Sequence, residues 1–243
     1  SPDLLGVSNG AAVGAALAIL LNSNLWVVQG FALIGGILAV SITVLIPRLV
    51  GQGGTLILVL SGIIISGFMQ AALGLLKYLA DPDSQLQSIV YWQLGSIAKL
   101  DIPSLLAALP MMIIGFIILI FFRWHLTIMS LGGQTAASQG INIERERLVI
   151  ILAATLLTAG AVCLAGTIGW IGLVVPHIAR RLIGDNARFA LPLAAIFGAA
   201  FLLVIDTLAR TMSTGEIPLS ILTGFIGTPV FIYILAHRKD LIQ

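Results

Sequence analysis

Few side chains in this protein could perform chemistry, and their spacing argues against a catalytic centre. The three histidines, His125, His177 and His237, lie far apart and show no metal-ligand spacing. We expect no nucleophile elbow of the Ser-His-Asp type, and no GxxxxGK[ST] motif is present to bind ATP phosphates. The one cysteine, Cys163, lies in an apolar run, where we expect a small buried hydrophobe. The sequence therefore predicts no catalytic residue, no metal site and no cofactor, and any ATP must be hydrolysed by another subunit.

A single acidic residue is expected at membrane depth. Asp206 falls near the outer end of a predicted span, and Arg210 follows it four positions later. Residues four apart share a helix face, so a local ion pair is the simpler interpretation. Acids inside a membrane mark ion or proton pathways, and an ion-coupled transporter should carry several at mid-depth. Their scarcity favours transport powered from outside the membrane domain. An ion-coupled secondary transporter is the alternative, and an intramembrane enzyme is a third option.

These groups must be positioned by helices in a membrane. Hydrophobic residues make up 59% of the chain and charged residues only 9%, whereas soluble domains carry roughly 25% charged residues. Lipid must therefore be the main solvent, and a net charge of +2 is too small to indicate nucleic acid. A spanning helix needs about 20 apolar residues. The sequence predicts an all-α, polytopic transmembrane bundle with about eight spans, at residues 5–21, 27–46, 56–79, 103–122, 148–165, 168–182, 190–209 and 217–235.

Basic residues give the predicted bundle an orientation. If the loops alternate sides, beginning with residues 1–8, nine of the twelve Lys and Arg residues share the first side. Only Lys77, Lys99 and Arg210 fall on the second side. The positive-inside rule makes the first side cytoplasmic.

Glycine and proline mark special points in the predicted helices. Gly10 and Gly14 have the GxxxG spacing that is typical of close helix packing in lipid. The sixth predicted span is short, and we expect Pro176 to break it.

Four ordered segments carry a resemblance that covers essentially the whole chain. They are SPDLLGVSNGAAVGA at 1–15, LGGQTAASQGINIERER at 131–147, GTIGWIGLVVPHIARR at 166–181 and EIPLSILTGFIGTPVFIYIL at 216–235. Together they resemble the FecCD-type permeases of bacterial ABC importers for iron-siderophores, haem and cobalamin. In that family two earlier spans precede the first segment. The resemblance therefore implies that residues 1–243 form a single transmembrane permease domain with about eight spans of an expected ten.

The resemblance also implies a function and a set of partners. We expect the membrane permease subunit of an ATP-driven, binding-protein-dependent importer of iron-siderophore, haem or cobalamin type chelates. Such a subunit pairs with a second permease subunit, either a second copy or a homologue. Cytoplasmic ATPase subunits bind it from one side, and a periplasmic or lipid-anchored substrate-binding protein binds it from the other. The expected location is the cytoplasmic (inner) membrane of a bacterium or archaeon.

The resemblance assigns the cytoplasmic loop 123–147 to ATPase docking, where two glycine breaks suggest two short helices. The family usually reads closer to LGEETARSLG there. This chain has Gly133 in place of the acid, Ala137 in place of the arginine and Gln139 in place of an apolar residue. Docking by shape and apolar contact is compatible with those changes, while specific polar contacts are not supported. The expected ATPase-docking residues are Leu131, Gly132, Gly133, Gln134, Ala137, Gly140, His177 and Arg180.

On the outer side, the resemblance makes Arg210 and Glu216 the residues that dock the binding protein. Tyr91 and Trp92 lie in an outer loop, where aromatic residues anchor a protein at the membrane interface. The third span places small and polar residues in a helix that borders the central pathway in the family, and core packing is the alternative role for them. The expected pathway-lining residues are Gly62, Ser66, Met69 and Gln70.

Overall fold

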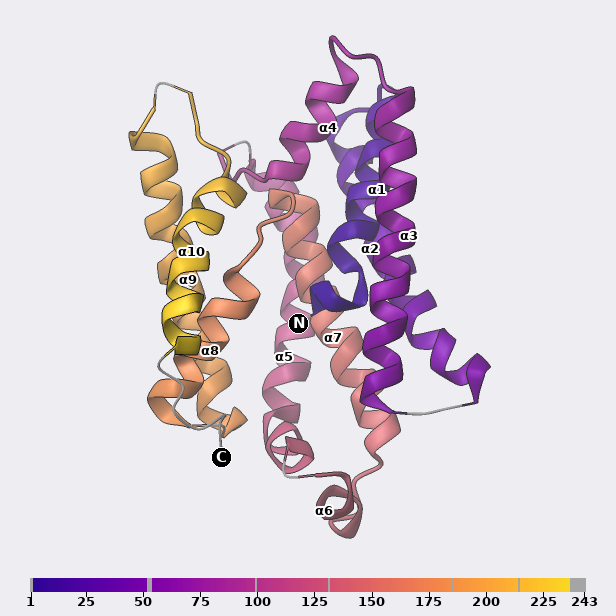
Figure 1. The fold of residues 1–243 in the computed structure, drawn as a ribbon, viewed down its shortest axis with the longest axis vertical. Coiled ribbons are helices and arrows are strands. Elements are labelled where there is room, and N and C mark those ends of the chain that lie inside the picture. Colours follow the sequence, from indigo (N-terminus) through magenta and orange to yellow (C-terminus); the bar gives the residue numbers. More distant parts are fainter. Residues whose placement is uncertain are drawn as a thin grey trace.

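The computed structural model of the protein describes residues 2–51, 54–98, 100–130, 132–184, 186–213 and 215–236. Within these ranges the chain forms one 3-10 helix and ten α-helices, with no strand (Figure 1). The elements are η1 (Pro2–Leu5), α1 (Val7–Leu20), α2 (Leu25–Val50), α3 (Thr55–Leu79), α4 (Gln85–Leu94), α5 (Ile102–Ser130), α6 (Gly133–Ser138), α7 (Ile143–Ala165), α8 (Ile171–Ile183), α9 (Ala187–Thr211) and α10 (Leu219–Ala236). The predicted all-α fold class is confirmed.

Several of these helices can cross a membrane on their own. Among the described residues, α2, α3, α5, α7 and α9 are long and apolar enough, while α1 and α10 are shorter apolar helices. α8 has only 13 residues. Each of the eight predicted spans thus corresponds to a helix, but five reach the length that a single span needs. The polytopic membrane architecture is confirmed.

Large apolar side chains face outward from the bundle. Leu49 is 75% exposed and Phe121 is 79% exposed. In the most apolar window of α5, only 6% of the residues are buried within the chain. A surface of this kind belongs in lipid, because contiguous apolar patches are small on proteins that are solvated by water.

Small residues let α1 and α2 pack closely. A Cβ atom added at Gly10 would lie 2.4 Å from the carbonyl oxygen of Gly35, and one at Gly14 would lie 2.0 Å from that of Phe31. No hydrophobic force drives helices together in lipid, so close backbone approach supplies the attraction instead. The predicted role of Gly10 and Gly14 in close packing is confirmed.

The N-terminal segment lies inside the bundle, which corrects its predicted place on the cytoplasmic side. A Cβ atom at Gly62 of α3 would lie 2.0 Å from the carbonyl oxygen of Leu4, and the Thr43 hydroxyl of α2 donates a hydrogen bond of 3.0 Å to the carbonyl oxygen of Leu5. Gly62 lies seven residues into α3, or roughly 10 Å along it. Figure 1 likewise shows the N-terminus at mid-height. Asp3 of η1 is therefore a second acidic residue within the bundle, and Asp206 is not alone there.

Pro176 does not break its helix, contrary to the sequence prediction. α8 continues through it from Ile171 to Ile183. The interruption comes earlier, between α7 and α8, where Gly166 has φ 72° and Trp170 has φ 70°. Proline removes one hydrogen bond and can kink a helix without ending it, whereas a residue at positive φ has left the helical region of the backbone.

Two predicted loops also contain more helix than expected. The outer loop after α3 holds α4, which is covered by α1 and packs Ile89 into its core. On the cytoplasmic side, α5 continues to Ser130 and α7 begins at Ile143, so a single short helix, α6, lies between them. The second of the two predicted short helices is in fact the first turn of α7. Asn142 starts that turn, because its side-chain oxygen accepts a hydrogen bond of 3.1 Å from the Arg145 backbone N–H.

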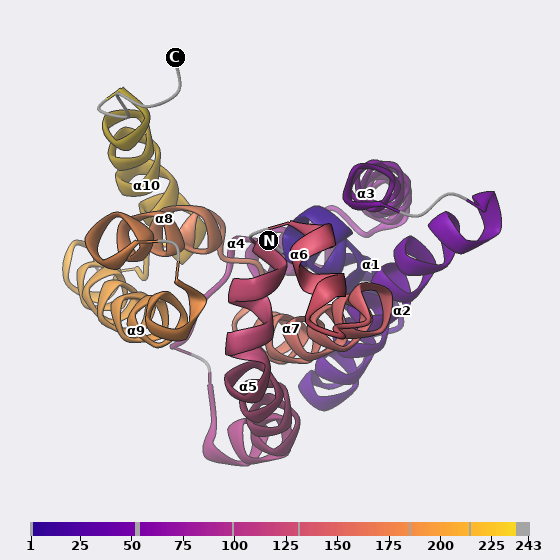
Figure 2. The ribbon, with the colours of Figure 1, turned by 90° about the horizontal axis from the view of Figure 1, so that it is seen from below.

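The helices form two groups that lie side by side (Figure 2). In one group, η1 and α1–α7 pack around α1 and α7, and in the other α8 packs with α9 and α10. α5 contacts α9, and α10 contacts α4. The two groups also meet at the outer end of the bundle, in an apolar cluster of Ile205, Ala209, Leu219 and Leu222 with Ile97 and Ile168 packed against it.

Candidate functional site

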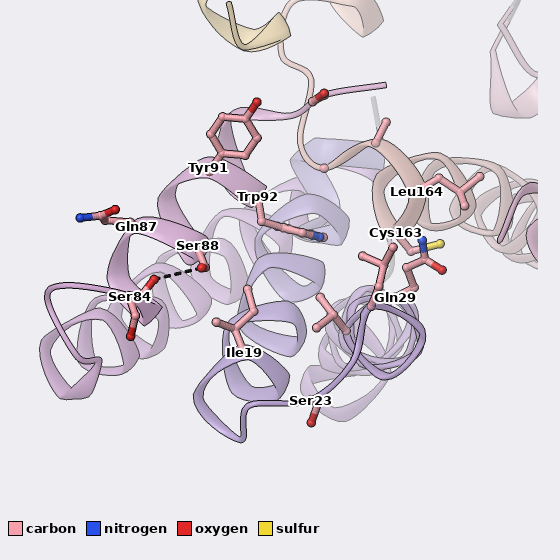
Figure 3. A pocket seen from close by; sticks show the side chains of 15 residues that line it. Ile19, Ser23, Gln29, Ser84, Gln87, Ser88, Tyr91, Trp92, Cys163 and Leu164 are labelled. Atoms are coloured by element: carbon pink, nitrogen blue, oxygen red, sulfur yellow. Dashed lines mark hydrogen bonds between the residues drawn. The ribbon is translucent and has the colours of Figure 1, made fainter. Parts of the chain in front are cut away.

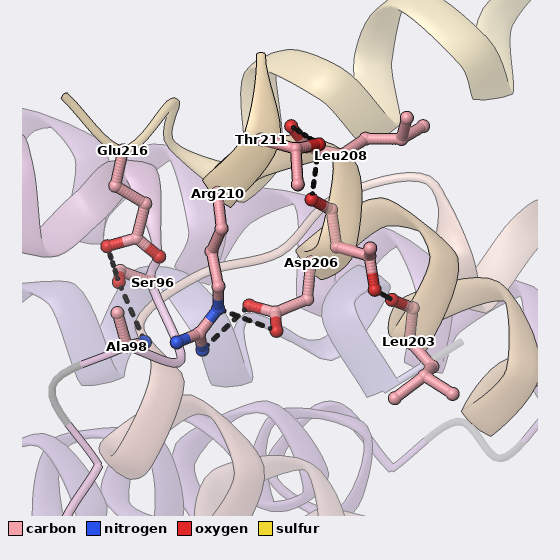
Figure 4. A network of polar contacts seen from close by, with 9 residues as sticks. Ser96, Ala98, Leu203, Asp206, Leu208, Arg210, Thr211 and Glu216 are labelled. Atoms are coloured by element: carbon pink, nitrogen blue, oxygen red, sulfur yellow. Dashed lines mark hydrogen bonds and ion pairs between the residues drawn. The ribbon is translucent and has the colours of Figure 1, made fainter. Parts of the chain in front are cut away.

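Arg210 and Asp206 form a local ion pair at the outer end of α9 (Figure 4). Arg210 donates from Nε to Asp206 Oδ2 at 2.9 Å and from Nη2 to Asp206 Oδ1 at 3.1 Å. Two parallel bonds of this kind fix the orientation of both groups. The Arg210 side chain is 47% exposed and that of Asp206 only 19%. The predicted local pair is confirmed, and one side of the guanidinium remains open to solvent or to a partner.

Glu216 lies beside the same guanidinium, in the connection from α9 to α10 (Figure 4). Its Oε2 accepts a hydrogen bond of 3.0 Å from the Ser96 hydroxyl, which also accepts one of 3.2 Å from the Ala98 backbone N–H. Its Oε1 is buried and has no hydrogen-bond partner among the described residues. Sequence analysis missed Ser96, because a lone serine after Gly95 carries no signal of a contact 120 residues away.

Backbone hydrogen bonds join three chain segments next to this carboxylate. We call this site the outer junction: residues 93–96 after α4, residues 165–167 after α7 and residues 219–220 at the start of α10. The Ser96 N–H donates to the Ala165 carbonyl at 2.9 Å, and the Leu219 N–H donates to the Gly95 carbonyl at 3.0 Å. The Thr167 hydroxyl donates to the Gln93 carbonyl, and the Ser220 hydroxyl donates to the Thr167 carbonyl.

Two glycines make the outer junction possible. Gly95 has φ 76° and Gly166 has φ 72°, in the left-handed region that favours glycine. A Cβ atom at Gly166 would lie 2.2 Å from the Trp92 carbonyl oxygen and 2.9 Å from Cα of Gly95. No other residue fits there without displacing the backbone.

A cavity of about 530 Å³ opens beside the outer junction (Figure 3). α4 contributes Ser88 and Trp92, with Ser84 just before it, α2 contributes Gln29, and α7 contributes Cys163. None of the lining residues is charged. Trp92 packs partly buried against α1 and α7, so the prediction that it is an exposed interface anchor is wrong, whereas Tyr91 is exposed. Cys163 is buried and donates from Sγ to the Gly160 carbonyl at 3.2 Å, which confirms its predicted role as a small buried residue.

The cytoplasmic end presents α6 on a short, glycine-bounded loop. Gly132 has φ 118° and Gly140 has φ 76°, and a Cβ at either would have nothing within 4 Å. Ala136 is fully buried against Ile128 and Ile141, whereas Ala137 is exposed. Leu131 lies outside the described residues. Gly133 and Gln134 are described only as positions in α6.

His177 and Arg180 lie on α8, which reaches the same end of the molecule as α6 (Figure 1). The His177 ring is half-buried and meets the Phe231 ring edge-on, with centroids 5.7 Å apart. Arg180 is exposed. The structure does not bring these residues into one cluster with α6, because α6 packs with α5 and α7 while α8 packs with α9 and α10.

The predicted pathway residues of α3 have different surroundings. Gly62 is buried against η1, and the Ser66 hydroxyl would lie 3.3 Å from a Cβ at Gly6. Met69 and Gln70 are at least partly exposed. Gly62 thus contacts backbone, whereas Met69 and Gln70 are accessible on one side of α3.

Catalysis finds no support in the described residues. Gly6–Gly10 has the letters of a G-x-S-x-G elbow, but its serine, Ser8, lies in the first turn of α1 and donates a hydrogen bond to Asp3. No strand precedes it in the described chain, as the elbow requires. The described part of the chain also holds no group of three or more His, Cys, Asp or Glu residues that could bind a metal.

Comparison with known proteins accounts for this arrangement. The sequence profile described as the FecCD transport family matches residues 1–237. The chain belongs to the FecCD transport family. Among its relatives, the molybdate import system permease protein MolB of Haemophilus influenzae is 35% identical over 231 residues, which cover 95% of this chain and 68% of that protein. A probable iron chelatin transport system permease protein of Helicobacter pylori is 38% identical over 239 residues, covering 98% and 72%.

A solved structure agrees with this assignment. It is titled as an inward-facing conformation of a metal-chelate type ABC transporter, and it matches with a TM-score of 0.92 and 33% identity over 97% of this chain and 75% of that one. This FecCD protein is therefore a membrane permease subunit of an ABC importer and not itself an enzyme. Family membership implies ATPase and binding-protein partners and dimerisation. The ion-coupled alternative is not supported.

Proposed function

We propose that this FecCD permease imports a metal chelate, of the ferric siderophore, haem or cobalamin type, delivered by a binding protein. The iron chelatin permease of Helicobacter pylori, at 38% identity, is the observation that carries this proposal. The similarity to a metal-chelate type transporter supports it. The relative from Haemophilus influenzae imports molybdate, so a small oxyanion is the competing substrate class.

The cargo can be identified from the binding protein encoded with this permease. Mass spectrometry of the native binding protein should find an intact organic chelate with its metal. Excess of that chelate should inhibit uptake by the reconstituted importer, whereas excess molybdate should not. Inhibition by molybdate, with no organic ligand on the binding protein, would overturn the proposed substrate class.

We propose further that α6 is the main contact for the ATPase. The loop that holds it is short, and its only large side-chain contacts among the described residues run inward, through Ala136, to Ile128 and Ile141. The exposed Ala137 and the open surroundings of Gly132 and Gly140 leave a small, nearly uncharged surface that could enter a groove. Leu131, Gly133 and Gln134 belong to the same proposed surface. His177 and Arg180 would form a second, separate contact at the end of α8.

On the opposite face, Arg210 and Glu216 are proposed to receive the binding protein. The exposed part of the Arg210 guanidinium offers donors to a carboxylate, and Asp206 holds it in a fixed orientation. Glu216 contributes negative charge beside it. Between the two faces, Ser66, Met69 and Gln70 are the proposed pathway residues, with Gly62 seating η1 at their inner end.

The proposed location is the cytoplasmic membrane of a bacterium or archaeon, with α6 inside. Single-cysteine labelling in a Cys163→Ala background tests this orientation. Ala137→Cys should react only with a reagent that reaches the cytoplasm, and Gln87→Cys on α4 should react from outside, because both positions are exposed. Labelling of position 137 from outside would contradict the orientation and the ATPase contact together.

A further inference from the structure

A second cavity of about 570 Å³ lies at the cytoplasmic end of the bundle, away from α6 and α8. It is bounded by the last turn of α2, the first turn of α3 and the first turns of α7. Its charged lining residues are Arg48, Glu144, Arg145 and Arg147, and we call it the arginine pocket. The proposed import function uses none of these side chains.

The three arginines of this pocket have no partner in the part of the chain that the structure describes. The ion pairs found there join Arg210 to Asp206 and His125 to Glu146. Glu146 therefore neutralises a different element, α5, although it sits between Arg145 and Arg147 in the sequence. Glu144 lines the pocket but forms no ion pair with a described residue. With three guanidinium groups and one carboxylate, the pocket carries an excess of positive charge.

Backbone charge adds to that excess. The pocket includes the start of α7, where unpaired N–H groups give a helix a partial positive charge. Asn142 caps one of these groups, the Arg145 N–H. A negatively charged group would therefore be attracted both by side chains and by the end of the helix.

The surroundings of the pocket are apolar. Its inner wall includes Val44, Leu58 and Ile151, which pack against the core beneath η1. Beside its mouth, on α2 and α3, Leu49 is 75% exposed and Leu56 is 72% exposed. A ligand that fits must therefore combine an anionic group with hydrocarbon that can lie along these helices.

We propose that the arginine pocket binds the headgroup of an anionic phospholipid from the inner leaflet. The phosphate would lie among Arg48, Arg145 and Arg147, and the acyl chains would follow Leu49 and Leu56 into the bilayer. Basic pockets between helices on the cytoplasmic side of membrane proteins suit such headgroups. The inference requires that the chain spans a membrane, and it does not depend on the identity of the imported substrate.

Lipid binding can be measured on the assembled importer in nanodiscs. The probe is phosphatidylglycerol mixed into phosphatidylcholine, and native mass spectrometry counts the phosphatidylglycerol that stays bound on release. The test variant replaces Arg48, Arg145 and Arg147 with Gln. The control variant removes the same charge on the same face by replacing Arg123, Arg181 and Arg188 with Gln. We expect the affinity for phosphatidylglycerol to fall roughly tenfold or more in the test variant only.

Two further arms distinguish a lipid site from a loss of folded protein and from a site for free phosphate. Replacing the same three arginines with Lys should restore most of the binding, because the charge returns while the protein is otherwise changed as much. Inorganic phosphate, given to the importer in neutral detergent, should not compete with phosphatidylglycerol at millimolar concentration. Equal loss in the control variant, full retention in the test variant, failure of Lys to rescue, or displacement by free phosphate would each overturn the proposal. So would loss of the ATPase subunit from the test variant, because the pocket would then belong to that interface.

Discussion

Ser96 and Glu216, 120 residues apart, are joined by a hydrogen bond of 3.0 Å that ties the end of α4 to the start of α10. This bond spans the two groups of helices, whose cores are otherwise separate, and it lies directly behind Arg210. Any force that a docked binding protein applies to the outer face would therefore act first on the outer junction.

Removing the Ser96 hydroxyl should destabilise the protein. In Ser96→Ala the Glu216 carboxylate keeps no described hydrogen-bond partner, because its other oxygen already lacks one. Leaving a buried acceptor unsatisfied costs about 1–3 kcal/mol. The thermal midpoint of the purified protein in detergent should drop, while Ser88→Ala, which loses only a local bond to the Ser84 carbonyl, should change it little. Equal midpoints for the two variants would contradict the role of Ser96.

Gly166→Ala should be more damaging than any glycine substitution in an open site. Its φ is 72°, and the new Cβ would lie 2.2 Å from the Trp92 carbonyl oxygen. We expect a loss of more than about 1 kcal/mol of stability. Gly74→Ala on α3 is the matched control, because a Cβ there meets nothing within 4 Å and alanine favours the helix. Indistinguishable unfolding curves would mean that the outer junction tolerates movement of Trp92.

Gly132→Trp and Gly140→Trp should uncouple ATP hydrolysis from the binding protein. Both glycines have positive φ and open surroundings, so a large side chain would reshape the α6 loop and obstruct a groove without a clash inside the chain. The readout is ATPase activity stimulated by loaded binding protein in proteoliposomes. Gly184→Trp at the end of α8, with φ 79° and equally open surroundings, controls for backbone strain alone. Full stimulation in both loop variants would place the ATPase elsewhere.

Arg210→Glu should weaken the affinity of the binding protein and leave basal ATPase activity intact. The substitution places a negative charge where the proposed partner carboxylate would lie. Salt screens attraction between exposed charges, so the affinity of the unaltered protein should fall with ionic strength, and that of the variant should fall less. Asp206→Asn tests the rival role, since it breaks only the local pair. If both variants merely lose folded protein, Arg210 is structural.

Local sequence patterns were enough to predict the helices but not their contacts. Apolar runs identified all eight span positions, and Gly10 with Gly14 identified the α1–α2 contact, because both signals lie within one helix. α4 was missed because its ten residues mix polar and apolar side chains. The burial of η1 was missed because it depends on Gly62 and Thr43, which are distant in sequence. Ser96 was missed for the same reason.

Motifs shared with the family pointed to α6, Arg210 and Glu216 as docking residues, and these assignments remain predictions. The structure adds constraints that no motif contained. Ala136 faces inward, so Ala137 is the position to label. Arg210 is already held by Asp206, so a partner must compete with that pair or share it.

ATP-dependent uptake tests the central conclusion, that this FecCD chain is the permease of an ATP-driven importer, most directly. The permease, its ATPase and its loaded binding protein would be reconstituted in proteoliposomes, with ATP on the side that α6 faces. Accumulation of the labelled chelate should require ATP and should persist when ionophores abolish every ion gradient. Accumulation without ATP that collapses on addition of an ionophore would contradict this conclusion and restore the ion-coupled alternative.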